Sequence, residues 1–236
     1  MNSGSTEIVS VSRSTGSLRR VATSSGRTYL VLKGPGTGRF LEEGAVLDRA
    51  DIEELEGPVA RAAGLSLALR FLSRRERTEH EVRVALEAEG IDNQASIDYI
   101  VETLKAKNLL DDRRFASELI EYRLRHNPAG PALLRRKLSV AGVSAGITDE
   151  LLAEAFPPGE EERIASKLAV ERLARTGLAG REDGRTDDPA VLRAGRERAV
   201  RRLSGFLARR GFSAGITGSI CAGILRGEIT GETDEQ

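Results

Sequence analysis

Two adjacent carboxylates are the residues in this chain whose type and spacing most readily suggest chemistry. Asp111 and Asp112 stand side by side, shortly before Phe115. Such a pair can ligate a metal ion or act as general acid and base. It can also cap a helix, because carboxylate oxygens accept hydrogen bonds from the free N–H groups of the first turn and favour its positive end. We favour the helix cap, which makes the motif a joint between neighbouring helical segments.

Two further patterns could indicate a site, and each has a simpler explanation. The stretch Gly34–Gly38 is rich in glycine, but Arg39 and Phe40 stand where a phosphate loop closes with Gly-Lys-Ser/Thr. A connecting turn is therefore expected there. His80 and His126 are far apart in the sequence and lack partnering cysteines, which argues against a zinc site. We expect no catalytic residues, no cofactor and no metal ion.

Composition limits where the protein acts. Cys221 is the only cysteine, so no intramolecular disulfide can form, and a reducing compartment is compatible with the chain. It lies beside an apolar stripe and is expected to be a small core residue. No apolar run is long enough to span a bilayer. The 36 basic and 36 acidic residues balance, so the whole chain is not a polycation that would coat nucleic acid. We expect a cytoplasmic protein without membrane contact.

Basic residues gather in two segments. The segment from Arg193 to Arg210 contains one acidic residue, Glu197. A shorter basic cluster lies at Arg135–Lys137. The candidate partner-binding residues are Arg135, Arg136, Lys137, Arg198, Arg201, Arg202, Arg209 and Arg210. These residues either form solvated helix faces or an electrostatic surface for an acidic protein groove or for phosphates.

The elements that position these residues come from a repeat. The heptad Gly142–Thr148 returns, with one change, as Gly211–Thr217. The equivalent apolar residues before the two heptads are Leu134 and Leu138, and Leu203 and Leu207; a looser copy contains Val82, Leu86 and Gly90. Each copy is an apolar helix face followed by a glycine, which predicts helix ends at Gly90, Gly142 and Gly211. Units that each bury only part of their apolar surface must stack on one another.

The whole chain is expected to be mainly α-helical, with three tandem three-helix modules. The expected segments are a β-rich extension over 1–57, modules over 58–110, 111–158 and 159–226, a flexible insertion over 177–189 and a disordered tail over 227–236. In the extension, three stretches alternate or cluster like strands, and a short acidic helix follows Leu47; the strands are Glu7–Ser12, Leu18–Ala22 and Thr28–Lys33. They predict a small antiparallel sheet.

Local signals mark several helix starts. Thr78 and Glu81 form a capping-box pattern. Pro131 suits the first turn of a helix. Thr148 is expected to cap the third helix of the second module.

The sequence resembles the RecX family, the regulatory protein of the bacterial RecA recombinase. The resemblance covers roughly residues 58 to 226, and its most specific part is the Leu-Asp-Asp-x-x-Phe-Ala run. The segments that carry it are Leu67–Leu72, Arg77–Glu81 with Leu86, Leu109–Ala116, Gly130–Pro131 with Leu134, Leu138 and Gly142–Val143, and Arg209–Phe212. The N-terminal stretch containing Leu47, Asp48 and Asp51–Glu53 also looks like an extension that some members carry.

The resemblance implies three modules in a curved array that lies along the groove of a RecA filament on single-stranded DNA. There it would suppress ATP hydrolysis and strand exchange and limit filament growth. We expect a monomer whose partner is the RecA filament, with weak DNA contact. The insertion over 177–189 departs from the family pattern, because it enlarges a loop between the first two helices of the third module.

Two other classes of protein remain as alternatives. A three-helix unit can be a helix-turn-helix that reads DNA, although the balanced charge weighs against it. An enzyme is a third class, but no nucleophile, base and orienting residue can be assembled from this sequence.

Overall fold

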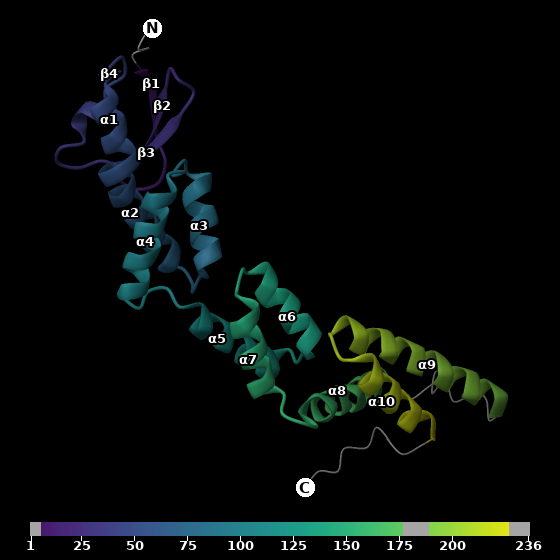
Figure 1. Cartoon of the computed structure of the whole chain (residues 1–236). Helices are drawn as coiled ribbons and strands as arrows, with labels where there is room; N and C mark the ends of the chain where they lie inside the picture. The colour runs from purple at the N-terminus through teal and green to yellow at the C-terminus, as the bar shows by residue number, and fades with distance from the viewer. Residues whose placement is uncertain (1–5, 177–188, 227–236) are drawn as a thin grey trace. The chain divides into compact units, whose positions relative to one another are not determined.

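The computed structural model describes residues 6–176 and 189–226 (Figure 1). The chain divides into two compact units, Met1–Phe115 and Ala116–Gln236. The expected tail over 227–236 lies outside the described residues, as does the expected insertion except for Pro189. Within the described part, no helix is long and apolar enough to cross a membrane.

The first unit begins with a four-stranded antiparallel sheet in the order β3-β2-β1-β4. Its strands are β1 (Thr6–Arg13), β2 (Leu18–Thr23), β3 (Thr28–Leu32) and β4 (Val46–Leu47). The three strands expected from the sequence are confirmed. Gly16 and Gly26 supply the positive φ angles of the two connecting turns, 57° and 81°. The short β4 pairs with Thr6 and Glu7 and was not expected, because two residues carry no alternation signal.

A helix follows the sheet. The expected short acidic helix is α1 (Arg49–Glu54), which starts at a capping box formed by Asp48 and Asp51. It continues through the π-helical turn η2 (Leu55–Val59) into α2 (Ala60–Leu72). Pro58 lies inside η2, and a proline lacks the N–H that regular α-helical pairing needs. The change of character expected at residue 57 therefore falls within one helical run.

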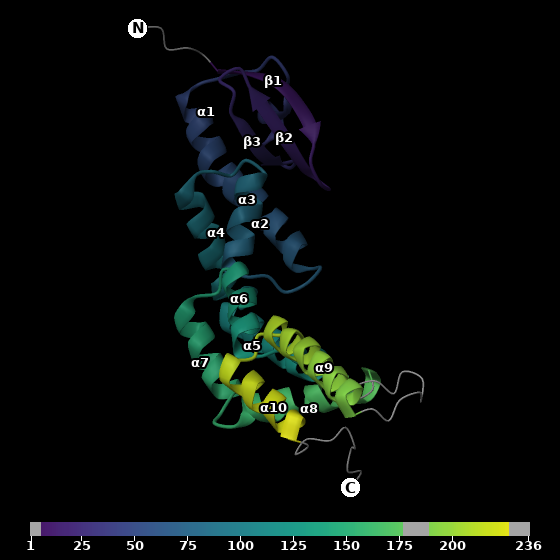
Figure 2. The same cartoon turned by 90° about the vertical axis from the view of Figure 1, so that its right-hand side faces the viewer.

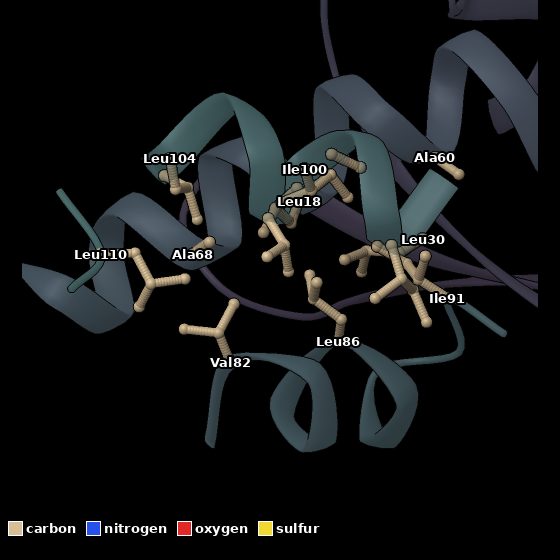
Figure 3. Close-up of a cluster of buried hydrophobic side chains, with 13 residues drawn as sticks. Leu18, Leu30, Ala60, Ala68, Val82, Leu86, Ile91, Ile100, Leu104 and Leu110 are labelled. Carbon is tan, nitrogen blue, oxygen red and sulfur yellow. The ribbon is translucent and has the colours of Figure 1, made fainter. Parts of the chain in front are cut away.

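Helices α2, α3 (Glu79–Ala88) and α4 (Gln94–Ala106) complete the first unit's three-helix bundle. Their apolar faces meet strands β2 and β3 in one buried cluster (Figure 3). It contains Leu18 and Leu30 from the sheet and Val82, Leu86 and Ile100 from the helices. The other face of the sheet, with Val21 and Val31, packs in a second cluster. The sheet is thus buried on both faces, which is how so few strands can be stable.

The second unit holds two further three-helix groups. The first has α5 (Asp112–His126, starting in the first unit), α6 (Pro131–Val140) and α7 (Ala145–Ala155). The second has α8 (Glu160–Thr176), α9 (Pro189–Arg209) and α10 (Ala214–Arg226). Helices α8, α9 and α10 pack on one another around a common apolar cluster (Figures 1 and 2). Cys221 belongs to this cluster, as expected.

The repeat positions have the structure that the sequence predicts. Leu134, Leu138, Leu203, Leu207, Val82 and Leu86 are all buried. Gly90, Gly142 and Gly211 follow their helices with φ angles of 92°, 82° and 83°, the left-handed conformation that ends a helix. The predicted helix ends are therefore confirmed.

One predicted cap is wrong. Thr148 lies buried inside α7, and the cap is Ser144, whose Oγ accepts the N–H of Ile147 at 3.4 Å. Ser213 does the same for Ile216 at 3.4 Å before α10. The serine at the third place of each heptad is the true start signal. Thr78 and Glu81 do form the predicted capping box, and Pro131 occupies the first turn of α6.

Candidate partner-binding surface

The arginines of α9 divide by their position around the helix. Val200, Leu203 and Leu207 face the core. Arg198, Arg201, Arg202 and Arg209 are exposed on the other side. We call these four residues the α9 arginine face. Among the described residues, no carboxylate pairs with Arg201 or Arg202. Glu197 is bound to Arg193 at 3.5 Å and leaves the face uncompensated.

Gly205 lies in the middle of the α9 arginine face. A glycine inside a helix costs stability relative to alanine, so it needs a packing reason. Here the Arg209 guanidinium folds toward it: a Cβ at this position would lie 3.2 Å from Nη1. The Arg198 side chain also lies along the helix, and its Nε donates to the Ala194 carbonyl at 3.2 Å. Because Gly205 has no side chain, only backbone lies between the arginines at this point of the face.

The basic residues of α6 are in a different situation. Arg135 donates from Nη2 to Asp149 of α7 at 2.7 Å, so its charge is partly compensated. Arg136 is exposed and Lys137 is half-buried. Arg135 and Arg136 follow the core residue Leu134, whereas Arg201 and Arg202 precede its equivalent, Leu203. Because successive helical residues are about 100° apart, Arg136 and Arg201 both lie nearly opposite the core stripe, while Arg135 and Arg202 lie toward different sides of it.

The end of α9 is joined to the start of α6 (Figure 1). Gly130 N–H donates to the Arg210 carbonyl at 2.8 Å, and Ala132 N–H donates to the Gly211 carbonyl at 3.2 Å. Carbonyls at the end of α9 thus accept hydrogen bonds from N–H groups at the start of α6 that have no partner within their own helix. A Cβ on Gly130 or Gly211 would overlap the opposite backbone. Both glycines are required for this contact, which we call the α9–α6 joint.

Arg210 serves the α9–α6 joint rather than the exposed face. Its Nη1 donates to the Pro128 carbonyl at 3.0 Å and to Asn127, and its guanidinium lies 5.1 Å from the Phe206 ring centroid. Burial, with repulsion from Arg123 and Arg172, lowers the pKa of the Arg210 guanidinium. The Arg210 guanidinium makes its contacts within the protein and is not part of the α9 arginine face.

The carboxylate pair caps the first turns of two different helices, α5 and α3. Asp111 Oδ1 accepts the N–H of Arg114 at 3.0 Å, in the first turn of α5. Asp112 Oδ1 accepts the N–H of Glu79 at 2.8 Å, in the first turn of α3. The expected cap is confirmed, and the structure adds that Asp112 caps α3 as well. Phe115, the third residue of the motif, is half-buried.

Ion pairs surround this cap. Lys105 Nζ lies 2.7 Å from Glu79, and Arg114 Nε lies 2.8 Å from Glu76. Burial raises the pKa of the Asp112 carboxyl above its ordinary value, against the effect of the Glu79 hydrogen bond. Burial would also raise the pKa of Glu79, but hydrogen bonds from Lys105 and Arg83 outweigh it and lower that pKa.

The remaining candidate motifs are structural where the chain is described. Gly34–Gly38 forms a turn in which Thr37 Oγ1 donates to the Leu32 carbonyl at 3.0 Å, and the turn leads into the short η1 (Gly38–Leu41). The rings of His126 and Tyr122 are in contact in a tilted arrangement, with centroids 4.8 Å apart. Within residues 6–176 and 189–226, no three His, Cys, Asp or Glu side chains are grouped as metal ligands would be.

The fold and this surface define a class: a tandem three-helix repeat protein that presents charged helix faces. Two family models match the chain, RecX first three-helix domain over residues 65–104 and RecX second three-helix domain over residues 111–152. A regulatory protein RecX from Corynebacterium efficiens is 34% identical over 182 residues, which cover 76% of this chain and 78% of the relative. The chain belongs to the RecX family.

Other relatives agree with this assignment. A regulatory protein RecX from Lactococcus lactis is 36% identical over 137 residues, 58% of this chain, and the match spans 50% of that relative's length. A crystal structure of regulatory protein RecX superposes with a TM-score of 0.54 at 20% identity, covering 91% of this chain and 98% of that chain. The crystal structure of RecX from Lactobacillus salivarius gives 0.55 at 21% identity, covering 69% and 95%. These two structures support the fold.

Proposed function

We propose that this protein binds RecA recombinase filaments and mainly inhibits their ATP hydrolysis, growth and strand exchange. Membership of a family of regulatory proteins supports the proposal. The observation that carries it is the α9 arginine face, whose Arg201 and Arg202 are exposed and unpaired within the described residues. Arginine holds carboxylates in bidentate pairs and tolerates desolvation at interfaces, so this face suits an acidic protein surface.

The proposed regulator acts by binding, without catalysis or cofactor. It works as a cytoplasmic monomer, with modules over 58–110, 111–158 and 159–226 as its binding units. Arg135, Arg136 and Lys137 form a second basic contact, which is weaker because Asp149 already holds Arg135.

Titration of the host RecA's DNA-dependent ATPase with this protein tests the proposal. A regulator that lies in a filament groove or at a growing end affects many recombinase subunits per copy. Inhibition is therefore expected at substoichiometric amounts. Inhibition that appears only when the protein saturates the DNA would contradict the proposal and favour simple competition for DNA.

The second candidate is a DNA-binding protein. The exposed arginines of α9 are the observation in its favour, because phosphates attract unpaired arginines as carboxylates do. The equal numbers of acidic and basic residues, 36 each, count against it. A gel-shift comparison at physiological salt separates the two candidates: the regulator retards only DNA that carries recombinase, and the DNA-binding protein also retards bare DNA.

A further inference from the structure

An open hollow lies between the two helical groups of the second unit, away from the α9 arginine face. Its volume is about 410 Å³. Its walls include Leu152, Ala153 and Phe156 at the end of α7, Glu161 and Glu162 at the start of α8, and Ile216 in α10. We call it the α7–α8 hollow. Apart from Arg135 on its wall, the proposed regulation of RecA does not use the hollow.

The apolar part of the α7–α8 hollow is accessible and rigid. Phe156 and Ile216 are half-buried, so each leaves apolar surface to solvent. Pro157 and Pro158 follow Phe156 directly and stop α7, because the residue before a proline is driven out of the helical conformation. Gly159, at φ 85°, then lets α8 begin. This short turn holds Phe156 at the mouth of the hollow.

Hydrogen bonds fix the polar walls. Glu161 Oε1 accepts the N–H of Ser213 at 2.7 Å and ties α8 to the start of α10. Across the opening, Arg135 holds Asp149 at 2.7 Å. A site whose walls are already ordered spends little conformational entropy when a ligand enters.

The charge around the α7–α8 hollow is negative. No lysine or arginine occurs from residue 138 to residue 162, although this stretch contains acidic residues on both α7 and α8. Of the charges that line the hollow, Asp149 is compensated by Arg135, whereas Glu161 binds only a neutral N–H among the residues that the structure describes. Glu162 is exposed at the opening. The hollow thus combines an apolar floor with uncompensated carboxylates.

We propose that the α7–α8 hollow binds a protein segment that presents an aliphatic or aromatic side chain next to lysine or arginine. The apolar side chain covers Phe156 and Ile216, and the neighbouring cation meets Glu161 and Glu162. Charge complementarity selects this partner: the α9 arginine face attracts acidic surfaces, while the hollow attracts basic ones. The protein therefore has two docking surfaces of opposite sign.

A second copy of this chain that docks through its α9 arginine face is a poorer occupant. Its basic surface on α9 exposes arginines with small residues such as Ala208 between them. Among the residues whose exposure the structure describes, that face has no large exposed apolar side chain to fill the floor of the hollow. Self-association is therefore an outcome that the experiment must detect.

The test uses the full chain labelled with ¹⁵N and the peptide Ac-Arg-Leu-Arg-NH₂ as probe. The peptide should shift the amide signals of Ala153, Phe156, Glu162 and Ile216, and added salt should weaken binding. Ac-Glu-Leu-Glu-NH₂ and Ac-Arg-Ser-Arg-NH₂ test the charge and the apolar side chain, and each should bind about tenfold or more weakly.

Ala153→Arg should place a long side chain over the hollow and reduce peptide affinity by about tenfold or more. Ala153 is exposed on α7, so the fold should survive. Ala174→Arg, at an exposed position on α8 outside the hollow, is the matched control and should bind the peptide like the wild type.

Three results would overturn the proposal. The hollow signals could fail to move at millimolar peptide, or move equally with the acidic peptide. They could also shift with protein concentration alone and stop doing so in Arg201→Glu/Arg202→Glu, which would identify a second copy as the occupant.

Discussion

Arg201 and Arg210 show how neighbouring arginines of one helix take different roles at the scale of single residues. Arg201 is exposed, and no carboxylate pairs with it in the described part of the chain. Arg210 is half-buried and bonded to Pro128 and Asn127 across the α9–α6 joint. The sequence counts both as charges. Only the fold shows that replacing Arg210 would disturb packing, whereas replacing Arg201 changes the surface.

Changing Arg201 and Arg202 together to Glu should leave stability almost unchanged, because exposed charges contribute about 0–1 kcal/mol. Loss of docked arginines can cost about 2 kcal/mol or more in binding. We therefore expect thermal melting to stay constant while affinity for the recombinase filament falls about tenfold or more.

Melting curves and the RecA ATPase assay check this expectation. Arg49→Glu alters another highly exposed arginine, at 92% side-chain exposure, and should inhibit like the wild type. Unchanged inhibition by a folded double variant would show that the α9 arginine face is an ordinary solvated surface and does not bind the recombinase. Attention would then move to Arg136 and Lys137.

Asp112 offers a second test at this scale. Asp112→Ala removes the acceptor of the Glu79 N–H and should lower the free energy of unfolding by about 1 kcal/mol. Asp112→Asn keeps an oxygen acceptor without the charge that burial disfavours, so it should not lose stability. Urea denaturation at neutral pH measures both. Equal losses would show that the charge, and not the hydrogen bond, supports α3.

The raised pKa of Asp112 also sets the sign of a pH effect. The folded state holds this proton more tightly than the unfolded state does. Its stabilisation is thus present below the unfolded pKa of about 3.9 and is lost as pH rises through the folded pKa. Asp112→Asn should remove this loss. Denaturation midpoints of the two proteins should therefore differ least at the acidic end of the range.

At the scale of helices and strands, local patterns predicted what depends on neighbours in sequence. The heptads gave the helix ends at Gly142 and Gly211, and alternation gave three strands. The α9–α6 joint was not predicted. Gly130 stands before Pro131 and looks like an ordinary turn glycine, and nothing local reveals that Gly211 will meet it.

Gly130 is the best position at which to test the α9–α6 joint, because its backbone lies so close to that of Gly211. Gly130→Ala forces a methyl group against the Gly211 carbonyl, and such overpacking typically costs about 1–3 kcal/mol. Gly218→Ala is the control, because Gly218 lies within α10 with open space around it. That change should stabilise the protein by about 0.5–1 kcal/mol. Calorimetry measures both, and a neutral Gly130→Ala would mean that the joint can open freely.

At the scale of the molecule, the N-terminal sheet belongs to the body of the first unit. Gly90, which ends α3, lies so close to β3 that an added Cβ would sit 2.9 Å from the Thr28 carbonyl oxygen. Arg20 of β2 is paired with Glu89 at 2.8 Å. The sheet therefore covers the end of α3, in the way that terminal capping segments close a repeat array. The composition of residues 1–57 suggested a separate extension, since the shared core is visible only in three dimensions.

Leu30→Ala tests whether sheet and helices fold together. Leu30 is 1% exposed and lies in the cluster shared with α2, α3 and α4. Its truncation should cost about 2–5 kcal/mol of unfolding free energy. Because one core serves both parts, native-state hydrogen exchange should accelerate together in β2, β3, α3 and α4. Val9→Ala, at a 60% exposed position on β1, should leave exchange unchanged. If only the strands exchange faster in Leu30→Ala, the sheet is a separable extension, and the helices form their core without it.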